Sequence, residues 1–255
     1  MELKNISFSY ETTVLKDITA SFEKGKISAI IGPSGSGKTT LIELLATFLK
    51  PSHGTIEIEK DKRIGVVFEF PDKQFFKPTI KEELKYGLKN KNNDKKIVDV
   101  LEMVGLSEDF LERSPHCLSN GEKRRVAIAT ILITNPDVII LDEPTVGLDM
   151  NNKNNIIRLL KILKTKYNKT IIVVSQDIDF INKFVDNVYV LHNSQLIFTG
   201  EREKVLNNID VLKKYNIKPP KIVEFIDKIN VKKGVNVIYR DDINDLLKDI
   251  YRYVK

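Results

Sequence analysis

The chain has 255 residues, of which 42% are hydrophobic and 30% charged, and its 41 Lys and Arg against 35 Asp and Glu give a net charge of +6. This composition predicts a packed core and excludes a disordered chain, and the length allows one large α/β domain with an appendage or two small domains. The basic excess is spread along the chain, which favours a lysine-coated surface or an anionic membrane face over nucleic-acid binding.

The single cysteine, Cys117, excludes an internal disulfide and suits a reducing compartment. No apolar run reaches the ~18 residues that a membrane-spanning helix needs, and the first residues lack the apolar stretch of a signal peptide. We therefore expect that the chain neither crosses a membrane nor is exported, and that any role at a membrane comes through partner proteins.

The N-terminal part of the chain reads as a series of short strands. Residues 2–9 alternate between polar and apolar, a second strand is expected around Ile18–Phe22, and Ile27–Ile31 forms a buried strand. Another short strand is expected at Thr55–Ile58. These segments predict an antiparallel layer around a parallel core.

A glycine-rich loop follows the buried strand and precedes an apolar-striped helix that begins at Thr40. It fits the pattern G-x-x-x-x-G-K-[ST], in which glycines let backbone N–H groups surround an anion and the helix start adds its positive end. Lys38 can reach the β- and γ-phosphates, and the Thr39 hydroxyl can bind Mg²⁺. The sequence therefore predicts a site for ATP and Mg²⁺. Its nucleotide-binding residues are Gly32, Pro33, Ser34, Gly35, Ser36, Gly37, Lys38, Thr39 and Thr40.

Past the buried strand Ile64–Phe68, the periodicity is helical from Thr79 to about Thr134. Two of the expected helices cover Lys95–Val104 and Glu122–Ile133. This block predicts a helical subdomain, about residues 70–135, inserted between two strands of the core.

The second half returns to strands and then changes character. Asp137–Leu141 is the most apolar strand, as expected at the centre of a parallel sheet, and Ile171–Val174 is the next. An amphipathic helix at Ile156–Leu163 lies between them, and two short strands around residues 192–195 predict an edge hairpin.

The tail after Gly200 is broken by Pro219 and Pro220, and residues 241–255 form a helix candidate. Its apolar face consists of Ile243, Leu246, Leu247, Ile250 and Val254. This face either packs on its own domain or meets a second copy or a paralogue. We therefore divide the chain into a nucleotide-binding domain, residues 1–200, and a C-terminal extension, residues 201–255.

Two acids follow the central apolar strand. An acid at that strand end lies beside the phosphate loop in P-loop folds, so Asp142 can help to hold Mg²⁺. Glu143 can polarise a water molecule for attack on the γ-phosphate. The alternative is a pair of solvated acids, which the upstream phosphate loop makes the weaker interpretation.

A second anion site is predicted within the helical subdomain. Ser119 and Gly121 open a helix, where a hydroxyl and free backbone N–H groups can bind an anion. One chain does not need two γ-phosphate sites, so this one is expected to serve a nucleotide bound to another chain. The alternative is an ordinary Ser N-cap.

Together these stretches resemble the ATPase domains of ABC transporters over about residues 2–200, and four motifs in their usual order carry the resemblance. They are Gly32–Thr39, Leu118–Glu122, Val138–Glu143 and Gly147–Asp149. Phe70–Phe76 and residues 121–129 are similar to the energy-coupling-factor and cobalt-type branch. The resemblance implies an α/β P-loop NTPase fold of ABC type, with a mixed core sheet, an antiparallel β layer and a helical subdomain.

The resemblance also implies roles for single residues. They are adenine stacking by Tyr10, Mg²⁺ ligation by Asp142, catalysis by Glu143, contact of Ser119 and Gly121 with the partner's γ-phosphate, and communication between the two sites by Asp149. Two such subunits enclose two ATP molecules and move attached membrane subunits on hydrolysis.

Three positions depart from the family pattern. Glu69 stands where the family has a Gln that reaches Mg²⁺, and its carboxylate could bind the metal but adds negative charge. Gln176 stands at the catalytic His position and can carry neither a proton nor a positive charge. Asn120 replaces the first glycine of the signature motif, Leu118–Glu122. Asn tolerates a left-handed backbone better than most residues. We therefore expect slow hydrolysis at this chain's own site and a heterodimer with unequal sites.

The sequence thus predicts the ATP-binding subunit of an importer of a micronutrient, either a vitamin or a metal ion. Its expected partners are a second ABC ATPase subunit, paralogue or self, and integral membrane subunits that contact Phe70–Phe76; Phe75 and Phe76 could instead pack on the helical subdomain. A soluble ABC ATPase acting on nucleic acid or ribosomes would need insertions or a second cassette that 255 residues do not hold. A P-loop kinase would leave Ser119–Glu122 and Asp149 without a role.

Overall fold

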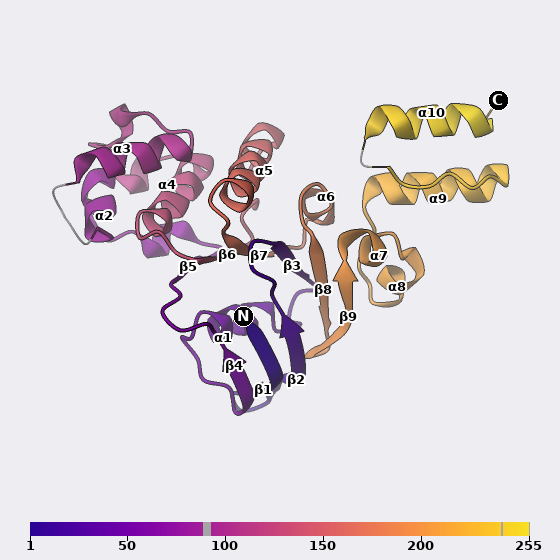
Figure 1. Cartoon of the computed structure of the whole chain (residues 1–255), viewed down its shortest axis with the longest axis horizontal. Helices are drawn as coiled ribbons and strands as arrows, with labels where there is room; N and C mark the ends of the chain where they lie inside the picture. The colour runs from indigo at the N-terminus through magenta and orange to yellow at the C-terminus, as the bar shows by residue number, and fades with distance from the viewer. Residues whose placement is uncertain (89–92, 241, 255) are drawn as a thin grey trace.

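The computed structural model describes residues 1–88, 93–240 and 242–254 (Figure 1). Two sheets form its centre. The smaller is antiparallel, with strand order β2-β1-β4, and consists of β1 (Glu2–Ser9), β2 (Thr13–Ser21) and β4 (His53–Glu57). The predicted antiparallel layer is therefore confirmed, although β2 begins at Thr13, well before the expected start at Ile18.

The larger sheet has the order β5-β6-β7-β3-β8-β9, in which the first five strands are parallel and β9 is antiparallel to β8. Its strands are β3 (Ile27–Ile31), β5 (Ile64–Val67), β6 (Val138–Asp142), β7 (Thr170–Val174), β8 (Asn187–His192) and β9 (Gln195–Glu201). Strand β6 lies inside the sheet, and β8 and β9 form the predicted edge hairpin. The α/β fold class predicted from the sequence is confirmed.

Because successive side chains of a strand point to opposite faces, each core strand feeds two separate hydrophobic cores. On β6, Val138 and Ile140 join the core that contains the small sheet and α1 (Lys38–Leu45), whereas Ile139 and Leu141 join the core beneath the other helices. That second core includes α2 (Ile80–Tyr86), α3 (Asp94–Met103), α4 (Asn120–Leu132), α5 (Met150–Thr165) and α6 (Ile178–Ile181). In Figure 1, α1 lies beside the small sheet, and α4 lies on the opposite side of the large sheet.

The helical block lies between β5 and β6, as predicted. Short 3₁₀ turns link its helices: η1 (Pro71–Gln74), η2 (Glu108–Phe110) and η3 (Pro115–Cys117). Helix α5 begins at Met150, six residues before the expected Ile156, because Asp149 caps it by accepting from the Asn152 N–H at 2.8 Å.

In the described part of the C-terminal extension the chain forms four helices: α7 (Arg202–Leu206), α8 (Ile209–Lys214), α9 (Lys221–Lys233) and α10 (Ile243–Val254). Helices α9 and α10 lie side by side, away from the two sheets (Figure 1). Leu246 of α10 is buried with Ile226 and Val237 in a small third core, and Leu247 is exposed. The side chains of Ile243 and Val254, also predicted on this face, lie outside the described residues.

Candidate functional site

The phosphate loop, residues 32–39, joins β3 to α1. Gly37 begins α1 with φ +101°, and a Cβ there would lie 2.8 Å from Leu15 Cδ2, so only glycine fits this close turn. Lys38 is buried, and its Nζ donates to the carbonyls of Gly32 at 3.0 Å and Pro33 at 2.8 Å. Burial lowers the pKa of Lys38, while Glu143 and Asp142 oppose that change.

The loop fits a bound polyphosphate. The Ser36 hydroxyl is buried without a hydrogen-bond partner among the described residues, which is rare for a buried polar group and marks a position for a ligand oxygen. A Cβ at Gly35 would meet nothing within 4 Å, so the loop is open there. Thr39 is exposed at the helix start, where backbone N–H groups are free to bind phosphate.

Asp142 ends β6 and is only 6% exposed. Burial, with Glu143 and Glu69 nearby, raises its pKa from the ordinary 3.8 to about 6, against the pull of Lys38 and Arg124. The carboxylate oxygens of Asp142 and Glu69 are donors of the kind that Mg²⁺ binds. This ion usually takes one or two carboxylates and completes its shell with phosphates and water. Within residues 1–88, 93–240 and 242–254, no three His, Cys, Asp or Glu side chains form a group that could hold a metal ion.

Glu143 is held by the loop between β7 and α6. Its Oε1 accepts from the Gln176 backbone N–H at 3.0 Å and its Oε2 from the Ser175 hydroxyl at 3.1 Å. Its backbone adopts φ +44°, which is uncommon outside glycine and is fixed by a 2.8 Å hydrogen bond from its N–H to the Val174 carbonyl. Burial raises the pKa of Glu143, while the bonds from Ser175 and Gln176 lower it.

Sequence reasoning missed Ser175, which the fully buried end of β7 places against the Glu143 carboxylate. The Gln176 side chain is exposed, so the backbone and Ser175 fix Glu143 whatever side chain stands at position 176. Gln176, Glu143 and Glu69 line one pocket together with the loop at residues 145–148. The structure thus brings two of the three departures from the family pattern, Glu69 and Gln176, to the same place.

Sequence reasoning also missed Arg124 on α4. It is 4% exposed, and its two Nη atoms donate to the carbonyls of Phe68 at 3.0 Å and Glu69 at 2.8 Å. The sequence signal was weak, because three consecutive basic residues on a helix usually belong to a solvated face.

Ser119 and Gly121 lie at the start of α4, where Ser119 is exposed and Gly121 is buried. The Ser119 hydroxyl accepts from the Glu122 N–H, and Glu122 accepts from the Ser119 N–H at 2.8 Å, which completes a capping box. The Ser119 hydroxyl also lies 2.7 Å from the Glu122 carboxylate, and its hydrogen bond, followed by the one from the Ser119 N–H, lowers the pKa of Glu122. A Cβ at Gly121 would lie 3.1 Å from the Asn152 side chain, whose amide donates to Asp149 at 3.1 Å. Asn152 therefore connects the signature motif, Leu118–Glu122, to Asp149 within one chain.

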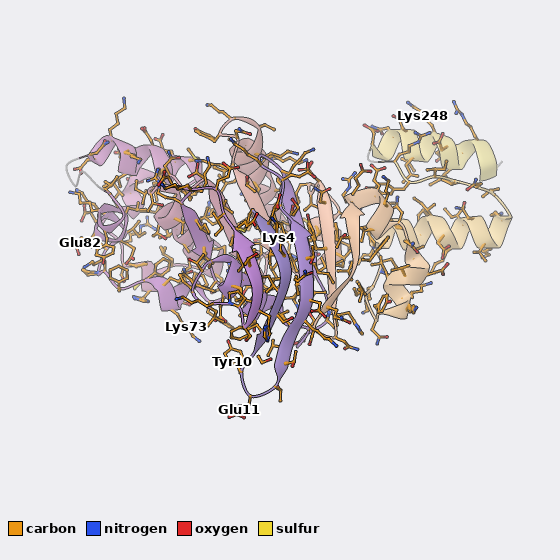
Figure 2. All side chains as sticks on the ribbon, turned by 60° about the horizontal axis from the view of Figure 1, so that its bottom comes forward. Lys4, Tyr10, Glu11, Lys73, Glu82 and Lys248 are labelled. Carbon is orange, nitrogen blue, oxygen red and sulfur yellow. The ribbon has the colours of Figure 1, made fainter. Side chains whose placement is uncertain are left out.

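Tyr10 is 60% exposed near the end of the β1–β2 hairpin, beside Glu11 (Figure 2). Its ring meets Phe8 edge-on at 4.8 Å, and its hydroxyl lies 3.3 Å from Glu43 on α1. A free ring face next to the phosphate-loop helix suits stacking on a base.

The two predicted anion sites belong to different faces of the large sheet. The buried side chains of α1 pack in one core and those of α4 in the other, so the phosphate loop and Ser119 do not share a core. Ser119 is exposed and points away from its own core.

Exposed aromatic rings lie where β5 runs into the helical subdomain. Phe70, Phe76 and Tyr86 are each more than half exposed, and Lys77 lies 5.1 Å from the Phe76 ring and 5.2 Å from the Tyr86 ring. Phe75 instead is buried beside His116 on the helical subdomain. Lys73, which is labelled in Figure 2, lies 5.0 Å from the Phe70 ring. None of the described helices is long and apolar enough to span a membrane.

Comparison with known proteins agrees with this geometry. The family model described as ABC transporter matches residues 15–146. The energy-coupling factor transporter ATP-binding protein EcfA of Methanocaldococcus jannaschii is 34% identical over all of this chain and 98% of its own length. EcfA2 of Mycoplasmopsis synoviae is 38% identical over 91% of this chain and 87% of its length.

Solved structures give the same result. CbiO1 of Clostridium perfringens, part of the ABC transporter complex cbiONQ, superposes with a TM-score of 0.75 at 32% identity and covers 89% of this chain and 98% of its own. A dimeric ATP-binding cassette in a post-hydrolysis state, bound to ADP and Pi, gives 0.69 at 29% identity over 79% of this chain and 98% of its own.

Proposed function

The chain belongs to the ABC transporter family and, within it, to the ATP-binding proteins of energy-coupling factor transporters, and from this premise we propose how its residues bind ATP and which partners complete the site. It is an ATPase subunit of an ABC importer. Membership in this family argues against the alternatives of a soluble ABC ATPase unconnected to transport and a P-loop kinase.

The phosphate loop holds the triphosphate, with Lys38 turned from the loop carbonyls to the β- and γ-phosphates. Thr39, Asp142 and Glu69 would hold Mg²⁺ together with the phosphates, and the ion would supply positive charge there. Glu143 orients the attacking water, Gln176 contacts the γ-phosphate, and Tyr10 stacks on the adenine.

The observation that carries the proposal is the separation of the phosphate loop from Ser119 by the large sheet. A second ABC ATPase subunit, paralogue or self, therefore contributes its own Ser119 and Gly121 counterparts to the ATP bound here. Charge-assisted hydrogen bonds to the γ-phosphate from both subunits hold the pair closed, and hydrolysis removes them.

The exposed patch of Phe70, Phe76 and Tyr86 contacts an integral membrane subunit, which keeps the chain at the cytoplasmic face. Glu83 supports this geometry, because its carboxylate accepts from the backbone N–H groups of Phe76 at 3.0 Å and Lys77 at 2.8 Å. Exposed aromatic rings on a backbone that is fixed in this way are typical of a protein contact surface. The cargo that we propose, a vitamin or a metal ion, rests on the likeness to the energy-coupling-factor and cobalt-type branch.

This chain's own site is the slower of an unequal pair. Glu69 adds a negative charge and Gln176 lacks the donor strength of a protonated His, and losing one oriented donor costs about 10²-fold in rate. Single-turnover hydrolysis by the chain and by its Glu69→Gln, Gln176→His double variant tests this. A native chain that turns over as fast as the double variant would contradict it.

The two-subunit site is tested in the complex purified from membranes. Lys38→Ala damages this chain's own site, whereas Ser119→Arg damages the site on the partner. We expect Ser119→Arg to remove most ATP hydrolysis and Lys38→Ala to remove little, because the partner's site is the fast one. The reverse order would show that this chain carries the active site, and a Ser119→Arg variant with full activity would refute the shared pocket.

A further inference from the structure

Helix α4, called the signature helix because the motif Leu118–Glu122 lies at its start, holds the backbone of Glu69 in place. The guanidinium of Arg124 grips two consecutive carbonyls, those of Phe68 and Glu69, through separate Nη atoms at 3.0 and 2.8 Å. Two bonds from one planar group fix both the position and the orientation of this turn. A lysine would supply the positive charge but could not donate to both carbonyls from one planar group.

Neighbouring contacts make the link firmer. Lys123, one residue before Arg124, lies 2.8 Å from Asp72 on η1. Gln74 returns to β5, donating to the Val66 carbonyl at 3.2 Å and accepting from the Phe68 N–H at 3.1 Å. Residues 68–74 are therefore tied to α4 on one side and to the core sheet on the other.

The guanidinium also sits among the acids of the site. Burial lowers the pKa of Arg124, while Glu69, Asp142 and Glu143 oppose this by favouring its charged form. Arg124 and Lys38 are the buried cations of the region that the structure describes, and Lys38 is committed to the phosphate loop. In the contacts of the described residues, Arg124 donates to two neutral carbonyls, so its charge can offset the nearby acids.

We propose that Arg124 is a positioning residue for Glu69: it fixes the Glu69 backbone relative to the signature helix, and its charge allows a third carboxylate to stand beside Asp142 and Glu143. The inference rests on the proposed placement of Mg²⁺ at Glu69. It accounts for how a chain with Glu in place of a neutral Gln keeps an intact site.

A double-mutant cycle tests the proposal, with wild type, Arg124→Gln, Glu69→Gln and the double variant. The measured quantities are the affinity for a fluorescent ATP analogue with and without Mg²⁺, and kcat and KM for ATP. We expect Arg124→Gln to weaken Mg²⁺-dependent binding about tenfold, the size typical of coupled neighbours, and to leave metal-free binding within about twofold. In the Glu69→Gln background the same change should cost about twofold, because the third charge is gone.

Two further variants keep the result independent of folding. Arg124→Lys retains the charge, and we expect it to recover part of the Mg²⁺-dependent affinity. Arg125→Gln is the matched control, since Arg125 also donates to a carbonyl, that of Gly105 at 2.8 Å, and it should leave Mg²⁺ dependence unchanged.

Independent effects of Arg124→Gln and Glu69→Gln would overturn the inference, as would an equal loss in Arg125→Gln. Failure of the proposed function has a different signature. Lys38→Ala would then leave nucleotide affinity unchanged both with and without Mg²⁺, whatever the cycle gives.

Discussion

Asp142 provides a quantitative test of the site, because its burial costs stability when the carboxylate is charged. The pKa of Asp142 is raised from 3.8 to about 6 in the folded chain, chiefly by burial and then by Glu143 and Glu69. The folded state therefore holds the proton more tightly than the unfolded state. The free energy of unfolding falls as pH rises from about 4 to 6, and the full penalty is present above about pH 6.

The magnitude follows from the shift. Each pKa unit is worth 1.36 kcal/mol, so the charged carboxylate costs about 3 kcal/mol above pH 6, as an order of magnitude. Asp142→Asn keeps the shape and removes the charge. We expect the nucleotide-free variant to be more stable than wild type by about this amount at pH 8, or roughly 6–10 °C in melting temperature for a chain of this size.

Urea unfolding at pH 8 and pH 5, without nucleotide, measures the effect. The gain should shrink at pH 5, where wild type is already largely protonated. The matched control is Asp210→Asn on α8, an exposed aspartate whose loss should change stability by less than about 0.5 kcal/mol. A gain that is absent, or equally large at both pH values, would refute the argument that a buried charge sits at the end of β6.

Three further changes probe single contacts. Ser175→Ala removes a donor to Glu143 and should slow single-turnover hydrolysis by this chain about tenfold; an unchanged rate would contradict this. Gly37→Ala forces a side chain into a left-handed turn and should weaken equilibrium ATP binding at least about tenfold, so an unchanged Kd would exclude the described loop. Leu246→Ala should cost about 2–5 kcal/mol locally, seen as faster hydrogen exchange in α9 and α10. The affinity of the Leu246→Ala variant for ATP should not change. A weaker affinity would mean that the third core supports the nucleotide site.

The sheet and the phosphate loop could be predicted because their signals are local. Runs of four apolar residues, such as those in β6 and β7, are typical of a buried strand, and the glycine pattern needs no distant partner. Helix α9 was missed because Pro219 and Pro220 were interpreted as a break. Proline is also common at the first turn of a helix, and here Pro220 directly precedes α9.

The contacts that complete the site were beyond sequence reasoning for a different reason. Arg124 reaches carbonyls 55 and 56 positions earlier in the chain, and Ser175 meets Glu143 across 32 positions. Backbone carbonyls carry no residue signature, so no pattern of side chains announces such a partner. These contacts follow from the packing of α4 and β7 on their neighbours.

The exposed Tyr10 ring has a consequence for nucleobase selectivity. Its hydroxyl already engages Glu43, so it offers a base the flat face of the ring rather than an edge that distinguishes one purine from another. Competition experiments with GTP should therefore find it nearly as good a ligand as ATP. The energy supply of the importer would then follow the total pool of purine triphosphates in the cell.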